Sequence, residues 1–127
     1  MAVLIDTSLL IAFERGTSEP DVVTEDAAIS VITVSELVHG IHRASATDRP
    51  RRHAIVEHYL DQFEIVNITE SIARVHAVLW ADLAAAGTAV GAHDLWIGAT
   101  AVAYGFGVMT RNARDFARVP GLRVVAA

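Results

Sequence analysis

The chain of 127 residues is long enough for one domain with a sizeable core, and its apolar fraction of 53% leaves hydrophobic surface for a partner. It contains no cysteine, which excludes disulfides, thiolate nucleophiles and thiolate metal sites. All ten basic residues are arginine, which excludes a P-loop and Schiff-base catalysis, and the net charge of −5 argues against broad nonspecific binding of nucleic acid.

The first third of the sequence predicts two units in which a strand leads directly into a helix. Residues 2–5 form an apolar run that ends at Asp6, and the residues at 6–8 are Asp, Thr and Ser, which often begin helices. A second strand is expected over 27–30. Thr33 is then expected to begin a helix, because apolar residues recur over 34–41 at the spacing of one helix face.

The rest of the chain continues this alternation. Pro50 suits a first helical turn, and Gly87 suits the end of a long helix. The expected elements are a helix over 51–62, a strand over 64–67, a helix over 69–86, a helix over 94–104, a strand over 107–110, a helix over 112–119 and a strand over 122–125. Strands that alternate with helices indicate an α/β fold with a doubly wound parallel sheet, in one domain that spans residues 1–127.

The apolar opening of the chain does not have the pattern of a signal peptide. Asp6 interrupts the apolar run, and no basic segment precedes it. The Ala-rich segment after Asp94 is interrupted by glycines and is too short to span a bilayer. We therefore expect a cytoplasmic protein.

Four acidic residues follow short apolar runs at or near the expected starts of helices: Asp6, Glu36, Asp94 and Asp115. In a parallel α/β fold the carboxyl ends of the strands gather at one edge of the sheet, where ligands bind. Four carboxylates gathered there would repel one another unless a cation lay among them. Their hard oxygen atoms suit Mg²⁺ or Mn²⁺ rather than zinc or copper.

Each acid also has a purely structural explanation as a helix cap. Asp6 and Asp94 each precede a helical pattern, while Glu36 completes a capping box that begins at Thr33, and Asp115 forms a similar pair with Asn112. Capping does not explain an acid inside the apolar run at Asp6. It also does not explain Asp94 in front of the most apolar helix of the chain, where an unneutralised charge is costly.

Short blocks that contain these acids resemble the PIN-domain family, and within it the VapC-type toxins of bacterial toxin–antitoxin pairs. The matching blocks are Leu4-Ile5-Asp6-Thr7-Ser8, Ile32-Thr33-Val34-Ser35-Glu36-Leu37 followed by Gly40, Asp94-Leu95-Trp96-Ile97-Gly98-Ala99-Thr100-Ala101, Thr110-Arg111-Asn112 leading to Asp115-Phe116, and Arg118-Val119-Pro120-Gly121-Leu122. They occur in the family's order and cover nearly the whole chain. Each block alone is a weak indication because it is short, but together the blocks are specific for this family.

The resemblance implies a three-layer α/β/α sandwich and a metal-dependent endoribonuclease that cuts transfer or ribosomal RNA. It implies that Asp6, Glu36, Asp94 and Asp115 bind one or two Mg²⁺ or Mn²⁺ ions, which activate water. Thr110 and Asn112 match polar residues that brace the family's pocket, and Ser8 matches a residue that binds a ligand carboxylate or the phosphate. The position of the fourth acid varies within the family, so Asn112 is an alternative to Asp115.

The resemblance also implies a homodimer that is inhibited by a small VapB-like antitoxin. Two alternatives remain open: an RNA-processing nuclease that lacks an antitoxin, and a non-catalytic PIN-like binding module. Arg111 and Arg114 flank the last acid and are candidates for phosphate contacts, with a solvated surface as the alternative.

The histidines and tryptophans give weaker indications of a functional role than the four acids do. His39 and His42 are expected on a helix surface, because no second Glu-x-x-His motif accompanies the one at Glu36. His93, next to Asp94, is a candidate for proton transfer, with an idle exposed residue as the alternative. Trp80 and Trp96 are expected in the core or an interface rather than as platforms for base stacking.

Overall fold

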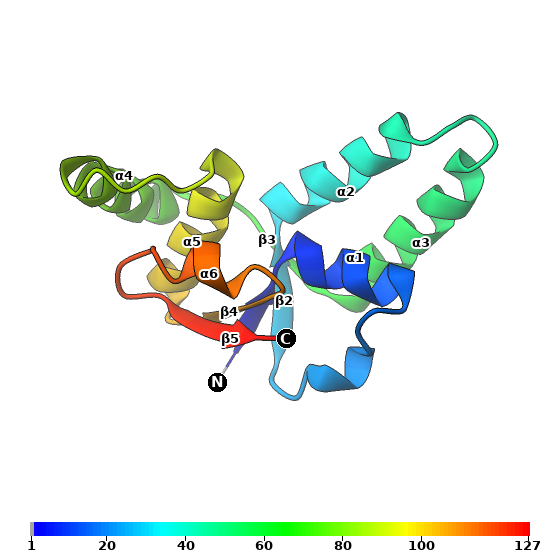
Figure 1. Ribbon diagram of the computed structural model, residues 1–127, viewed down its shortest axis with the longest axis horizontal. Coiled ribbons are helices and arrows are strands. Elements are labelled where there is room, and N and C mark those ends of the chain that lie inside the picture. The colour runs from blue at the N-terminus through cyan, green and yellow to red at the C-terminus, as the bar shows by residue number, and fades with distance from the viewer. Residues whose placement is uncertain (1) are drawn as a thin grey trace.

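Five parallel strands form a single sheet in the computed structural model, which describes residues 2–127 (Figure 1). The strands are β1 Val3–Ile5, β2 Ala27–Ser30, β3 Glu64–Val66, β4 Gly107–Thr110 and β5 Arg123–Ala126. Their order across the sheet is β3-β2-β1-β4-β5, and every neighbouring pair is parallel. The predicted single-domain α/β fold with a parallel sheet is confirmed.

Helices cover both faces of the sheet, so the three-layer arrangement is also confirmed (Figure 1). The helices are α1 Thr7–Arg15, α2 Val31–Arg43, α3 Arg49–Gln62, α4 Glu70–Ala85, α5 Ala92–Tyr104 and α6 Ala113–Phe116, with a 3₁₀ turn, η1, at Pro20–Val22. Helices α1, α2 and α3 lie on one face, and α4, α5 and α6 lie on the other. Among the helices of residues 2–127, none combines the length and apolar character that a bilayer span requires.

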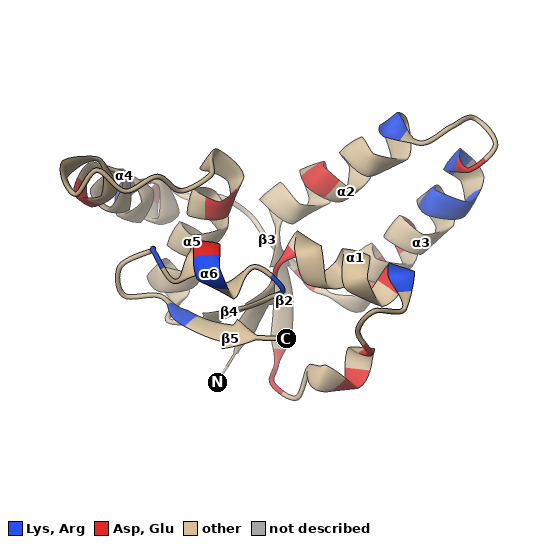
Figure 2. Cartoon of the chain, viewed as in Figure 1, with Lys and Arg blue, Asp and Glu red and all other residues tan. Residues whose placement is uncertain are grey.

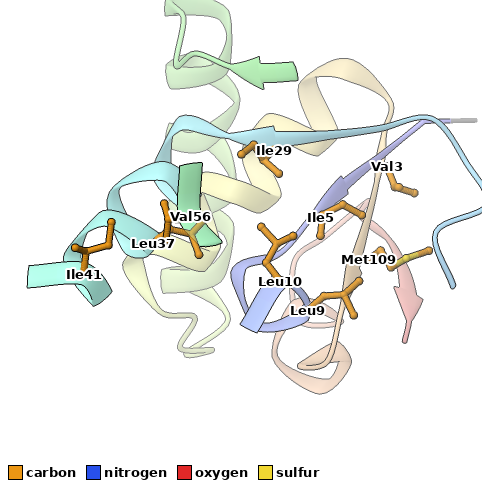
Figure 3. Packing of buried hydrophobic residues seen from close by; sticks show 9 residues of the cluster. All are labelled: Val3, Ile5, Leu9, Leu10, Ile29, Leu37, Ile41, Val56 and Met109. Carbon is orange, nitrogen blue, oxygen red and sulfur yellow. The ribbon is translucent and has the colours of Figure 1, made fainter. Parts of the chain in front are cut away.

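The central strand β1 is buried on both faces because its neighbours in chain and sheet are apolar. Val3 and Ile5 point to the side of α1 and α2, where they contact a cluster that includes Leu9 and Leu10 (Figure 3). Leu4 points the opposite way and packs on Ile97 of α5, as the two-residue period of a strand requires. Burial on both faces explains why this strand is an uninterrupted apolar run.

The strand order reverses next to β1. The chain passes from β1 to β2 and β3 on one side, and then crosses to β4 on the other side of β1. In open α/β sheets, ligands bind at the carboxyl ends of the strands where such a reversal occurs. Asp6 directly follows β1, and Thr110 is the last residue of β4. These two residues therefore mark the expected position of a site.

Three expected helices begin two residues earlier than predicted. Helix α3, expected from residue 51, begins at Arg49. Helix α2 begins at Val31, because the Ser30 hydroxyl accepts a hydrogen bond from the Ile32 amide at 3.0 Å and caps the helix there. Helix α5 begins at Ala92 with Gly91 as its cap residue, so Asp94 lies inside the first turn. The last helix is also shorter than expected, since α6 ends at Phe116.

Candidate active site

Asp6 is a buried carboxylate, only 3% exposed, held by two hydroxyl groups from different parts of the chain. Ser8 Oγ donates to Asp6 Oδ2 at 2.6 Å, and Thr110 Oγ1 donates to the same oxygen at 2.9 Å. Asp6 occupies the cap position of α1, yet its side chain makes no capping hydrogen bond. The capping explanation is therefore wrong for Asp6, and the two hydroxyls fix the carboxylate at the strand reversal instead.

Glu36 is positioned by α1 rather than by a capping box. Thr33 lies inside α2 and is fully buried, so the expected Thr33–Glu36 box does not form. Thr7 Oγ1 donates to Glu36 Oε1 at 2.9 Å, and it lies 3.1 Å from the Thr33 hydroxyl. Sequence reasoning assigned Thr7 no role in the site, although its position directly after Asp6 was a usable signal.

His93 approaches the site from the first turn of α5. Its Nδ1 atom lies 3.7 Å from Glu36 Oε2, and the imidazole ring is exposed. The two residues come from helices on opposite faces of the sheet, so the pair spans the carboxyl edge. Of the two alternatives for His93, the structure supports the one in which it reaches the site.

Asp94 is the carboxylate most affected by its surroundings. Its pKa is raised from 3.8 to about 6, with burial as the largest cause. The next causes are the negative charges of Asp6, Glu36 and Asp115, in that order, whereas His93 acts in the opposite direction. The four acids that the sequence singled out therefore lie close enough in space to act on one another. A cation among them would reverse this effect.

Asp115 and Asn112 differ in what they contribute. Asp115 lies in the first turn of α6 and is exposed, and its charge raises the pKa of Asp94. The Asn112 backbone amide donates to Thr110 Oγ1 at 2.8 Å, and its side chain makes no capping bond. Asn112 thus braces the hydroxyl that holds Asp6, and Asp115 supplies the fourth charge.

The donor set suits a hard divalent cation that keeps part of its water shell. Within residues 2–127, no three histidine, aspartate or glutamate side chains are arranged to hold one ion together. Magnesium commonly binds through one or two carboxylates and retains several waters. Both hydroxyls that bind Asp6 use Oδ2, and no hydrogen bond from the described residues reaches Oδ1. That oxygen and the Asp94 carboxylate therefore fit such an ion.

The arginines, the remaining histidines and the tryptophans singled out from the sequence differ in exposure and in contacts. Arg111 is exposed, and its guanidinium donates to the Thr17 carbonyl at 2.9 Å, whereas Arg114 lies exposed on α6. His39 and His42 are exposed on α2, as expected. Trp96 stacks on His76 with ring centroids 3.6 Å apart. Trp80 is 63% exposed, so of its two expected places, the core or an interface, only the interface remains.

The PIN-domain family model matches residues 3–122. Over 123 residues the chain is 33% identical to Ribonuclease VapC4 of Mycobacterium tuberculosis, a match that covers 96% of this chain and 94% of the relative. It is 35% identical over 101 residues to the tRNA(fMet)-specific endonuclease VapC of Salmonella typhimurium, covering 80% of this chain and 75% of the relative.

A solved structure shows a similar arrangement. DNA-bound VapBC from Salmonella typhimurium aligns with a TM-score of 0.90 at 30% identity, covering 99% of this chain and 98% of that chain. The family match spans strands β1 to β4, the helices of both faces and all four acids described above. The chain belongs to the PIN-domain family.

Proposed function

We propose that this protein is a divalent-metal-dependent endoribonuclease and the toxin of a toxin–antitoxin pair. The observation that carries the proposal is the convergence of Asp6, Glu36, Asp94 and Asp115 at the strand reversal, from four separate segments of the chain. Relatives named as VapC ribonucleases, one of them specific for a transfer RNA, support RNA as the substrate. Structured RNA, either transfer or ribosomal, is the proposed target.

The four carboxylates would together hold one or two Mg²⁺ or Mn²⁺ ions, with retained water completing the coordination because no three of these side chains are arranged to bind one ion directly. A bound ion would lower the pKa of a water molecule and stabilise the charge that develops on the phosphodiester. Ser8 and Thr110 hold Asp6 in a single orientation, and Thr7 does the same for Glu36. His93 is exposed and its Nδ1 atom lies 3.7 Å from Glu36 Oε2, which places an imidazole between the site and solvent.

A VapB-like antitoxin is the proposed protein partner, since the similar structure described above is a VapBC complex. We also propose a homodimer. Val78 and Trp80 on α4 are 61% and 63% exposed, and they supply apolar surface that an interface would cover. An RNA-processing nuclease without an antitoxin has no observation in its favour. A non-catalytic module would not need to retain all four acids.

The proposal is tested by incubating the purified protein with transfer RNA and ribosomal RNA in Mg²⁺, Mn²⁺ or EDTA. The expected result is cleavage at discrete positions that requires the metal and is lost in Asp94→Asn. Asp21→Asn is the matched control, because Asp21 is exposed in η1, which precedes β2 and lies at the edge of the sheet opposite the site. Cleavage that persists in EDTA, or equal cleavage by Asp94→Asn and the parent protein, would overturn the proposed mechanism.

A further inference from the structure

A groove of about 850 Å³ leads away from the candidate active site between α1 and α2. Its walls include Thr7, Ile11 and Arg15 from α1, and Glu36, His39 and Arg43 from α2. These residues recur every three or four positions, so each set lies along one face of its helix. His93 and Glu36 line the same groove, and it is therefore continuous with the site. Its volume lies within the range of pockets that hold ligands.

Charge changes sign along this groove. The end near the site carries Glu36, whereas Arg15 and Arg43 lie in the last turns of α1 and α2. Figure 2 shows basic segments at the far ends of these two helices and at the start of α3. From Glu36 to Arg43 the helix rises about 10 Å, at 1.5 Å per residue. A basic pair therefore lies about 10 Å along the groove from the acidic site.

The two arginines at this end are available for a ligand. The third groove arginine, Arg52, donates to Glu14 Oε1 at 2.6 Å, and Asp48 is held by Arg51 at 2.7 Å. No carboxylate of residues 2–127 lies within 4.0 Å of the guanidinium groups of Arg15 or Arg43. Both side chains are exposed. In a protein with a net charge of −5, two unpaired cations in one groove form a local site for an anion.

We propose that Arg15 and Arg43 bind the RNA backbone beyond the scissile phosphate, in the groove between α1 and α2. This assignment rests on the proposed ribonuclease function. A strand that crosses 10 Å carries at least one further phosphate, because phosphates of one strand lie about 3.4 Å apart along a stacked helix. The guanidinium group matches phosphate geometry through two parallel hydrogen bonds. The two arginines act as positioning residues that hold the substrate over the four acids.

The test is RNA binding by Arg15→Gln, Arg43→Gln and the double variant, all in an Asp94→Asn background with EDTA so that the RNA stays intact. The probe is a short fluorescein-labelled single-stranded RNA, followed by polarisation at several salt concentrations. Arg74→Gln is the matched control, because Arg74 pairs with Glu70 on α4, on the opposite face of the sheet. Circular dichroism and thermal melts check that each variant is folded.

Each groove variant is expected to weaken binding about tenfold, the loss typical of one hydrogen bond to a charged group. The double variant is expected to lower the slope of log K against log salt by about 1.4, which corresponds to two lost contacts on single-stranded RNA. In the parent protein, the same substitutions should raise KM and leave kcat unchanged, because they remove binding that is equal in the ground and transition states. Arg74→Gln is expected to change neither the affinity for RNA nor the salt slope.

The inference fails if the double variant keeps the parental salt slope, or if Arg74→Gln weakens binding as much as the groove variants do. It also fails if the double variant binds RNA normally but loses binding to a poly-glutamate peptide, which would identify the groove as a protein site. The proposed function fails separately, when the protein with Asp94 intact cleaves no RNA. The two failures are therefore distinguishable.

Discussion

Asp94→Asn is predicted to stabilise the metal-free protein near neutral pH. The folded-state pKa of about 6 lies above the ordinary value of 3.8, so between these values the folded protein binds more protons than the unfolded chain. Stability therefore falls as pH rises from about 4 to about 6, and the ionised carboxylate destabilises the fold above that range. At about 1.36 kcal/mol per pKa unit the full penalty is about 3 kcal/mol, and solvent screening at this partly exposed site reduces it to ~1–2 kcal/mol.

The assay is a thermal melt of the parent protein and of Asp94→Asn in EDTA, at pH 4 and pH 7.5. At pH 7.5 the variant is expected to melt roughly 4–8 °C higher, since 1 kcal/mol corresponds to about 4 °C for a domain of this size. At pH 4 the two proteins should melt together, because Asp94 is already protonated. Mn²⁺ at about 100 times its Kd should stabilise the parent by about 2.7 kcal/mol through linkage, with little effect on the variant.

Asp21→Asn serves as the control for the loss of one exposed negative charge, and its melting temperature should be the same as the parent's at both pH values. The reasoning is refuted if Asp94→Asn is less stable than the parent at pH 7.5 in EDTA, since that would show a stabilising role for the carboxylate in the fold. An equal difference at pH 4 and pH 7.5 would also refute it, because a titrating carboxylate cannot produce a pH-independent effect.

Three further outcomes are expected. Thr110→Val should lower the free energy of unfolding, measured in urea, by about 1–2 kcal/mol, because it removes the buried hydroxyl that donates to Asp6. Thr110→Ser retains a hydroxyl and should therefore keep most of the parental free energy of unfolding. Gly40→Ala should raise the free energy of unfolding by about 0.5–1 kcal/mol, since the added Cβ meets only Arg52 Nη2, at 3.5 Å, and alanine favours the helix. A lower free energy of unfolding would show a steric conflict instead. Burial lowers the pKa of His76, so the stability of the parent relative to His76→Phe should decrease as pH falls below 6.5, as urea titrations of both proteins at several pH values would reveal.

Local sequence patterns carried most of the information about secondary structure. The strands at 27–30 and 107–110 have their predicted bounds, because each is a short apolar run that ends at a hydroxyl residue, which is typical of a buried strand that leads into a loop or helix. The start of α2 was missed because two hydroxyl residues, Ser30 and Thr33, both suit a cap. Only the packing of Thr33 into the protein interior decides between them, since a buried residue inside the helix cannot also cap it.

The sequence by itself singled out the four acids, and it placed Asp6 directly after β1 and Asp115 shortly after β4, since parallel strands bring their carboxyl ends to one edge whatever the details of packing. Asp94 follows helix α4 rather than a strand, so only the packing of α5 brings it to this edge. The sequence did not determine how each acid is held. The hydroxyl of Thr7 reaches Glu36 across 29 positions, and Thr110 reaches Asp6 across 104. Contacts at such separations depend on how the helices pack on the sheet, which periodicity along the chain does not encode. The same holds for the groove between α1 and α2, where Arg15 and Arg43 are brought together only by the tertiary structure.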